Sequence, residues 1–94
     1  QQLNLDEKTA GQILHFLVRT NKLIHLTEDL YIWHSLLEEA KQRLKEEFAA
    51  EKEFSVAQVR DLLETSRKVA VPLMEYLDKI KFTQRIGETR KLIV

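Results

Sequence analysis

The 94-residue chain has no cysteine and is poor in proline, glycine and aromatic residues. Without cysteine it can form neither a disulfide nor a thiolate zinc site, and a reducing compartment suits it. One proline and two glycines argue against disorder or a long flexible linker. No apolar run approaches the roughly 18 residues that would span a bilayer, and the first residues do not resemble a signal peptide. We therefore expect a cytoplasmic chain without a membrane partner.

Patterns typical of catalysis and metal binding are also missing. The three histidines, at positions 15, 25 and 34, are too far apart for any common metal-binding motif. The sequence contains no phosphate-binding glycine loop and no nucleophile–base pair at a recognised spacing. We therefore expect no enzyme activity, no cofactor and no metal.

The chain is rich in charge, which is distributed unevenly. Charged residues make up 32% of the sequence and the formal net charge is zero. Residues 35–64 carry five basic and eight acidic side chains, whereas residues 65–94 carry seven basic and three acidic ones, a net charge of +4. Such asymmetry indicates an anionic partner for the C-terminal end.

The pattern of apolar residues predicts a helix and then a hairpin in the first third of the chain. Asp6 is placed to cap this helix. Its apolar face follows the i, i+3, i+4, i+7 spacing with Ala10, Ile13, Leu14 and Leu17. Two strand-like runs, residues 23–26 and 30–32, follow and are separated by a polar turn, which predicts a hairpin.

Three further helices and a second hairpin are expected from residue 35 onward. Capping-box pairs predict two of the helix starts: Ser35 with Glu38, and Ser55 with Gln58. Thr65 and Ser66 are expected to cap the last helix, and a turn at residues 87–89 closes the terminal hairpin. The side chains expected to face inward are Leu37, Ala40, Leu44, Phe48, Val56, Val59, Leu62, Leu63, Ala70, Leu73, Met74 and Leu77. The order helix, helix, helix, hairpin predicts a mainly α fold with small β-hairpin wings, a winged helix-turn-helix.

The two helix-plus-hairpin blocks repeat at an offset of 60 residues. The apolar positions of the first helix fall on those of the last helix. In the final strand the alignment is adjusted by two residues, so that residues 30–32 fall on residues 92–94. The repeat predicts a tandem arrangement. Residues 1–33 are expected to be the terminal helix and wing of a preceding, incomplete unit, and residues 34–94 a complete winged-helix domain.

The first candidate site is the start of the last helix, at Thr65, Ser66, Arg67 and Lys68. A helix N-terminus carries unpaired N–H groups and a partial positive charge, so two cations there oppose the helix and an anion would relieve the conflict. In a helix-turn-helix this end meets nucleic acid. The alternative is that both cations are simply solvated. Pro72 removes one backbone hydrogen bond and predicts a bend near Lys68, either orienting this end or merely accommodating the proline.

The second candidate site is the wing, with Arg85, Gly87, Glu88, Thr89, Arg90 and Lys91. The two arginines flank the tip and are expected to straddle a phosphate backbone. Glu88 can accept a hydrogen bond from an exocyclic amine or a guanidinium group. With Lys81 nearby, the wing and the helix start are predicted to form one positive surface. The alternative is a wing whose charges only keep it soluble.

Residues 54–93 contain three distinctive sequence motifs: TSRK, then PLMEYLD, then FTQRIGETR. They resemble the last winged-helix repeat of the bacterial selenocysteine-specific translation elongation factors, and residues 1–53 look like the end of the preceding repeat and the start of the last one. In that family the last winged helix binds a selenocysteine-insertion hairpin in mRNA, so the resemblance implies an mRNA stem-loop as the partner. The positions it implies as RNA-binding are Thr65, Ser66, Arg67, Lys68, Arg85, Gly87, Glu88 and Arg90. The Gly-Glu turn departs mildly from the Gly-Asp that is also common in the family.

The resemblance also implies partners that this chain does not account for. The family's GTPase part delivers selenocysteyl-tRNA on the ribosome, and no GTPase part is present in this sequence. One alternative with the same fold is a winged-helix transcription regulator that binds duplex DNA. Another is a protein-interaction module whose contact is the acidic helix of residues 35–50.

Overall fold

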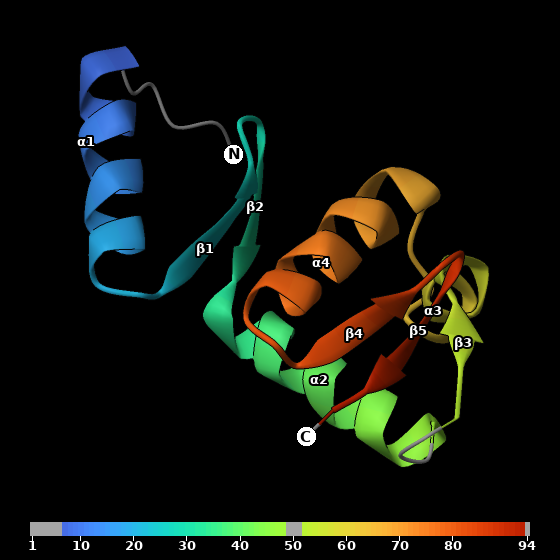
Figure 1. The fold of residues 1–94 in the computed structure, drawn as a ribbon. Coiled ribbons are helices and arrows are strands. Elements are labelled where there is room, and N and C mark those ends of the chain that lie inside the picture. The colour runs from blue at the N-terminus through green and yellow to red at the C-terminus, as the bar shows by residue number, and fades with distance from the viewer. Residues whose placement is uncertain (1–6, 49–51, 94) are drawn as a thin grey trace.

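The computed structural model describes residues 7–48 and 52–93 and divides them into two blocks (Figure 1). The first block, residues 7–33, contains one helix and a hairpin, and the second, residues 34–93, contains three helices and a three-stranded sheet. The elements are α1 (Glu7–Arg19), β1 (Leu23–Thr27), β2 (Leu30–Trp33), α2 (His34–Glu47), β3 (Phe54–Ser55), α3 (Val56–Leu62), α4 (Arg67–Lys79), β4 (Thr83–Ile86) and β5 (Thr89–Leu92). This order confirms the predicted winged-helix pattern; the predicted cap Asp6 lies outside the described residues.

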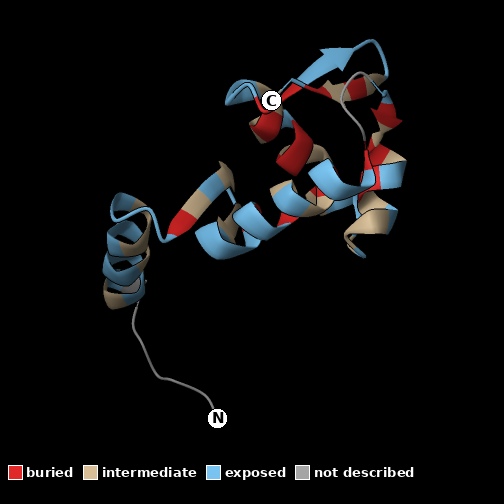
Figure 2. Cartoon of the chain, turned by 90° about the horizontal axis from the view of Figure 1, so that it is seen from below, coloured by how far each residue is buried: buried red, intermediate tan, exposed pale blue. Residues whose placement is uncertain are grey.

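The hydrophobic core lies in the second block, where α2, α3 and α4 meet the sheet (Figure 2). The inward faces predicted for α2 and α4 are buried, whereas Leu62 and Leu63 at the end of α3 are half-buried. Phe48 stacks on Phe54 at 4.4 Å between ring centroids, which links the end of α2 to β3. The buried core residues are Leu37, Ala40, Leu44, Phe48, Phe54, Val56, Val59, Ala70, Leu73, Met74, Leu77, Phe82 and Leu92.

The predicted capping box at the start of α3 is confirmed. The Ser55 hydroxyl accepts a hydrogen bond from the Gln58 amide at 3.1 Å, and the Gln58 side chain accepts one from the Ser55 amide at 2.8 Å. Two amides that a helix start leaves unpaired are thereby satisfied. Ser66 occupies the N-cap position of α4, as predicted, but its side chain makes no capping hydrogen bond.

The capping box predicted for α2 is wrong. The helix begins at His34, its N-cap residue is Trp33, and no side chain caps it. The His34 amide donates to the Lys22 carbonyl at 2.9 Å, so the chain passes from the β1–β2 hairpin directly into the helix. Ser35 is therefore already helical and cannot act as the cap.

The sheet of the second block has the order β3–β5–β4, and its first strand was not predicted. Only Phe54 and Ser55 form β3, pairing with Arg90 and Thr89 of β5. Two residues are too few to show the alternation by which a strand is recognised in a sequence. The β4–β5 hairpin, hereafter the wing, turns at Gly87, whose φ of +60° explains the glycine.

The helix-to-strand corners of the two blocks are equivalent at the predicted offset of 60. Asn21 and Lys81 both adopt positive φ, 61° and 64°. The next amide in each block reaches back to the last helical turn: Lys22 to the Leu17 carbonyl and Phe82 to the Leu77 carbonyl, both at 2.9 Å. Each corner is thus a Schellman-type helix end. The shared geometry supports the proposal that residues 1–33 and 34–94 belong to two similar units.

The alignment predicted for the second strands is wrong. Leu23 pairs with Trp33, and its equivalent Thr83 pairs with Leu92, so the strands correspond at an offset of 59 rather than 62. The first hairpin contains one more residue than the wing, and the register irregularity between residues 25 and 27 accommodates it. This corrected offset determines which side chains are equivalent in the two blocks.

The first block attaches to the second through its hairpin. Ile24, Leu26 and Ile32 of the hairpin pack against the core of the second block. The helix α1 packs mainly on β1 and leaves Ile13 45% and Phe16 51% exposed. All of the candidate site residues lie in the second block.

Candidate nucleic-acid interface

The start of α4 presents two cations to solvent. Arg67 and Lys68 are the first two residues of the helix, and both are exposed. Within residues 7–48 and 52–93, no carboxylate lies within ion-pairing distance of either side chain. Their charges add to the positive end of the helix dipole, so this end attracts anions. Ser66 is exposed beside them, whereas Thr65 is half-buried.

A sharp turn precedes α4. Glu64 adopts a φ of 53°, and the Thr65 amide donates to the Arg60 carbonyl at 3.0 Å, which closes the turn after α3. Pro72 lies inside α4, which continues to Lys79. Because proline has no amide hydrogen, the Lys68 carbonyl four residues earlier lacks its usual helical donor. Whether the helix bends there stays a prediction.

The wing supplies the other candidate residues, and most of them are exposed. Arg85, Gly87 and Glu88 lie at or next to the tip, and all three are exposed. The Nε of Arg85 donates to the Gly87 carbonyl at 3.0 Å, which holds the side chain along the tip. No described carboxylate pairs with Arg85. Its guanidinium group remains available for an anionic ligand.

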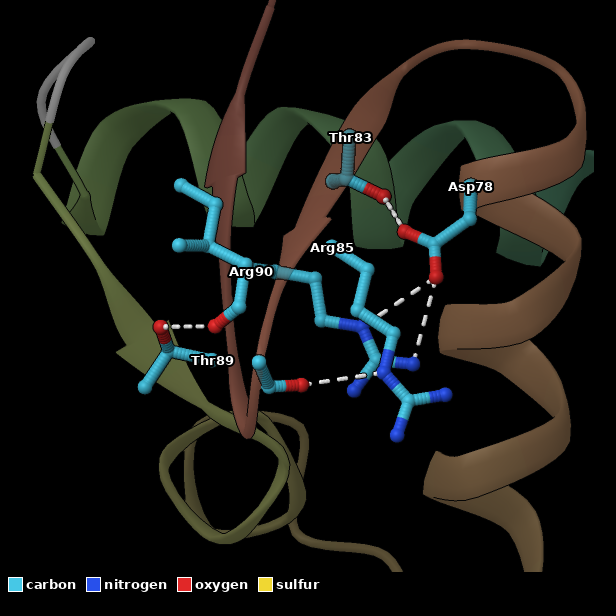
Figure 3. A network of polar contacts seen from close by, with 7 residues as sticks. Asp78, Thr83, Arg85, Thr89 and Arg90 are labelled. Carbon is cyan, nitrogen blue, oxygen red and sulfur yellow. Dashed lines mark hydrogen bonds and ion pairs between the residues drawn. The ribbon is translucent and has the colours of Figure 1, made fainter.

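Arg90 differs from Arg85 in its surroundings. It is only 5% exposed, and its guanidinium group pairs with Asp78 of α4 through Nε and Nη2, each 3.2 Å from Oδ2 (Figure 3). The other Asp78 oxygen accepts a hydrogen bond from the Thr83 hydroxyl at 2.6 Å. A buried, paired guanidinium group is not presented to an external phosphate. That Arg90 also contacts an RNA backbone stays a prediction.

The start of α4 and the tip of the wing lie at the same end of the second block in both views (Figures 1 and 3). Arg67 and Lys68, the first two residues of α4, and Arg85, beside the wing tip, therefore lie at that end of the block. Lys81 does not join them, because it follows the C-terminal end of α4. A helix of 13 residues is about 20 Å long, so the predicted extension of the positive surface to Lys81 is wrong.

The first block lacks a comparable site. Glu28 and Asp29 occupy the tip of its hairpin, so the tip is acidic. His25 and Tyr31 stand where the wing has Arg85 and Arg90, and their rings stack at 4.4 Å with an interplanar angle of 9°. The positive site is confined to the second block.

Sequence reasoning missed Asp78, the residue that holds the wing to α4. It lies in the PLMEYLD motif, but the sequence pattern alone does not indicate a role for it.

Neither a metal site nor a membrane helix emerges elsewhere: no group of three or more acidic, histidine or cysteine side chains in the described residues could hold an ion. Likewise, none of the helices in the described ranges is long and apolar enough to cross a bilayer.

Comparison with known proteins gives a consistent result. A family model for the winged helix of elongation factor SelB matches residues 46–92. The selenocysteine-specific elongation factor of Desulfomicrobium baculatum is 34% identical over 92 residues, covering 98% of this chain and 14% of that protein. The corresponding factor of Haemophilus influenzae is 38% identical over 79 residues, covering 83% of this chain and 12% of that protein. The chain therefore spans a small part of these relatives.

Solved structures show the same relationship in three dimensions. A bacterial selenocysteine-specific elongation factor, EF-Sec, superimposes with a TM-score of 0.80 at 32% identity, over 94% of this chain and 15% of that one. The mRNA-binding domain of elongation factor SelB from E. coli, solved in complex with SECIS RNA, superimposes with a TM-score of 0.74 at 27% identity, over 93% of this chain and 72% of that one. The sequence match and the shared fold lead to one conclusion: the chain belongs to the winged-helix family of elongation factor SelB.

Proposed function

We propose that this chain binds an mRNA stem-loop of the selenocysteine-insertion type, as part of a selenocysteine-specific translation elongation factor in the cytoplasm. The observation that carries the proposal is the superposition on a SelB domain solved with its RNA, which extends over both blocks of the chain. The chain is a winged-helix region rather than a catalytic domain. Selenocysteyl-tRNA, GTP and the ribosome are proposed partners of the whole factor, through parts outside this chain.

The geometry supports binding to a folded RNA end rather than to a long duplex. A-form RNA hides its base edges in a deep, narrow groove, so sequence is read in loops and bulges. Arg67 and Lys68 at the start of α4 and Arg85 in the wing are proposed to bind phosphates on either side of such a loop. Ser66 and Glu88 are proposed to hydrogen-bond beside them, with an extruded base entering the space between the two elements.

The remaining predicted residues have less direct parts in this proposal. Thr65 is half-buried at the turn before α4, and Gly87 permits the positive φ of the wing tip. Arg90 is proposed to support the wing from within. The DNA-binding alternative is not favoured, because a structural relative that was solved with a nucleic acid holds RNA.

The first prediction concerns the two cations of α4. Arg67→Ala with Lys68→Ala should weaken binding to a selenocysteine-insertion hairpin by about tenfold or more, because each lost phosphate contact removes charge-assisted bonds worth on the order of 1 kcal/mol. Binding is measured by fluorescence anisotropy against a hairpin with its bulge and loop intact, the same hairpin without the bulge, and a B-form DNA of equal length.

Lys8 provides a matched control, because it is exposed and stands where the first block aligns with Lys68. Lys8→Ala should leave hairpin binding unchanged. A preference for the DNA over the intact hairpin would contradict the proposed function. Equal losses in the Lys8 variant and the α4 variant would contradict the site.

A further inference from the structure

Three residues fix the wing to α4, and they form one polar network between the two elements that carry the proposed RNA site (Figure 3). We call Asp78, Thr83 and Arg90 the clamp. Thr83 is 1% and Arg90 5% exposed, while the Asp78 side chain is 22% exposed. The carboxylate uses both oxygens, one for the Thr83 hydroxyl and one for the Arg90 guanidinium group. The clamp therefore sets the position of both strands of the wing relative to the helix.

The first block shows that a helix followed by a hairpin does not require this network. At the corrected offsets, Asp78 corresponds to Val18, Thr83 to Leu23 and Arg90 to Tyr31. All three polar members are thus replaced together. The first block nevertheless forms the same helix end and the same kind of antiparallel hairpin. A structural need shared by both blocks cannot explain a network that only the second block contains.

The clamp also solves an electrostatic problem at the wing. Arg85 and Arg90 are direct cross-strand partners, so their side chains project from the same face of the wing. Like charges in that arrangement repel and would drive the exposed guanidinium group away from α4. Asp78 neutralises Arg90 and leaves the charge of Arg85 uncompensated. The result is a wing held against α4 with the uncompensated cation of Arg85 exposed to solvent.

We propose that Asp78, acting through Arg90 and Thr83, is a positioning residue for RNA recognition. It fixes the distance between the wing tip and the start of α4, so that Arg85, Arg67 and Lys68 meet one RNA hairpin together. Asp78 itself need not touch the RNA. The inference rests on the proposed function, which the wild-type chain tests separately.

The test is Asp78→Asn, which keeps the shape of the side chain and removes its charge. A purely electrostatic view predicts tighter binding, because one acidic group near the site is lost. Positioning predicts the opposite: hairpin affinity falls about tenfold, equivalent to roughly 1.4 kcal/mol, while affinity for an unrelated duplex RNA is unchanged or rises. Glu75→Gln on the same helix changes the net charge equally at an exposed position and should not weaken hairpin binding.

A second variant covers the case in which Asp78→Asn does not fold. The triple replacement Asp78→Val, Thr83→Leu and Arg90→Tyr transfers the corresponding residues of the first block into the second. It should fold, as judged by circular dichroism and thermal melting, yet lose the preference for the hairpin over duplex RNA.

The outcomes separate the two proposals. If the wild-type chain shows no preference for the hairpin, the proposed function fails. If the wild-type chain binds and a folded clamp variant binds equally well with the same preference, Asp78 is only structural and the inference is overturned.

Discussion

At the scale of single residues, the wing shows how neighbours decide the fate of identical side chains. Arg85 and Arg90 face each other across one hairpin, yet one is exposed and the other is buried against Asp78. A buried guanidinium group is stable only when it is paired and hydrogen-bonded, and Asp78 satisfies both needs. The charge that reaches solvent is therefore that of Arg85.

Replacing each of the two glycines with alanine should change the free energy of unfolding in opposite directions. Gly87→Ala should lower the free energy of unfolding by about 1 kcal/mol, because a Cβ is strained at a φ of +60° even though no described atom beyond the two neighbouring residues lies within 4 Å of its position. Gly11 lies inside α1, and a Cβ there would meet no described atom outside the helix's own backbone, so Gly11→Ala should raise the stability of that helix by up to about 1 kcal/mol. Urea denaturation followed by circular dichroism measures both. A stabilising Gly87→Ala would contradict the strain at the wing tip.

Some of the residue-level assignments could be made from the sequence, and some could not. Cations directly after a predicted cap mark the start of a helix, so Arg67 and Lys68 could be placed from their positions alone. Arg90 could not, because its partner lies 12 residues earlier on another element. Strand alternation shows that Arg85 and Arg90 share a face, but it does not show that the Asp78 carboxylate pairs with only one of them.

At the scale of elements, the capping-box pattern predicted the start of α3 correctly and the start of α2 wrongly. The start of α2 is determined by the neighbouring hairpin rather than by a local cap. The box at Ser55 and Gln58 is formed as predicted, since a short strand is followed by a helix with no other means of satisfying its first amides. At α2 the chain passes from the hairpin directly into the helix at His34, so Ser35 already lies within the helix and does not form a capping box with Glu38. Glu38 instead forms an ion pair with Lys41, with 3.3 Å between Glu38 Oε2 and Lys41 Nζ. The strand β3 could not be predicted either, because its two residues are too few to alternate and form a strand only by pairing with β5.

The two serines provide a matched pair of substitutions. Ser55→Ala should destabilise the second block by about 1 kcal/mol, because the Gln58 amide loses its acceptor at the start of α3. Ser35→Ala should change stability little, because Ser35 is exposed and caps nothing. Chemical denaturation of both variants provides the comparison. Equal effects would mean that the difference between the two helix starts is not real.

At the scale of the whole molecule, a net charge of zero conceals a division of charge between its sides. The surplus of basic residues after position 65 reaches the wing tip and the start of α4, whereas the acidic surplus of residues 35–64 lies mostly on α2 and around α3. Figures 1 and 3 place α2 across the second block from the wing tip. Because physiological salt screens exposed charges beyond about 8 Å, a ligand at the wing experiences the local cations more than the total charge.

This division predicts how RNA binding depends on salt. The logarithm of the hairpin affinity should fall linearly with the logarithm of the KCl concentration, because bound phosphates release counterions. Arg85→Ala should reduce the steepness of that line by about one unit, the contribution of one phosphate contact. Glu46→Gln with Glu47→Gln makes the chain more positive by two charges on α2, yet should leave the slope unchanged. If the α2 variant steepens the line as much as Arg85→Ala flattens it, RNA responds to the total charge of the chain, and a local phosphate-binding surface at the wing and α4 is contradicted.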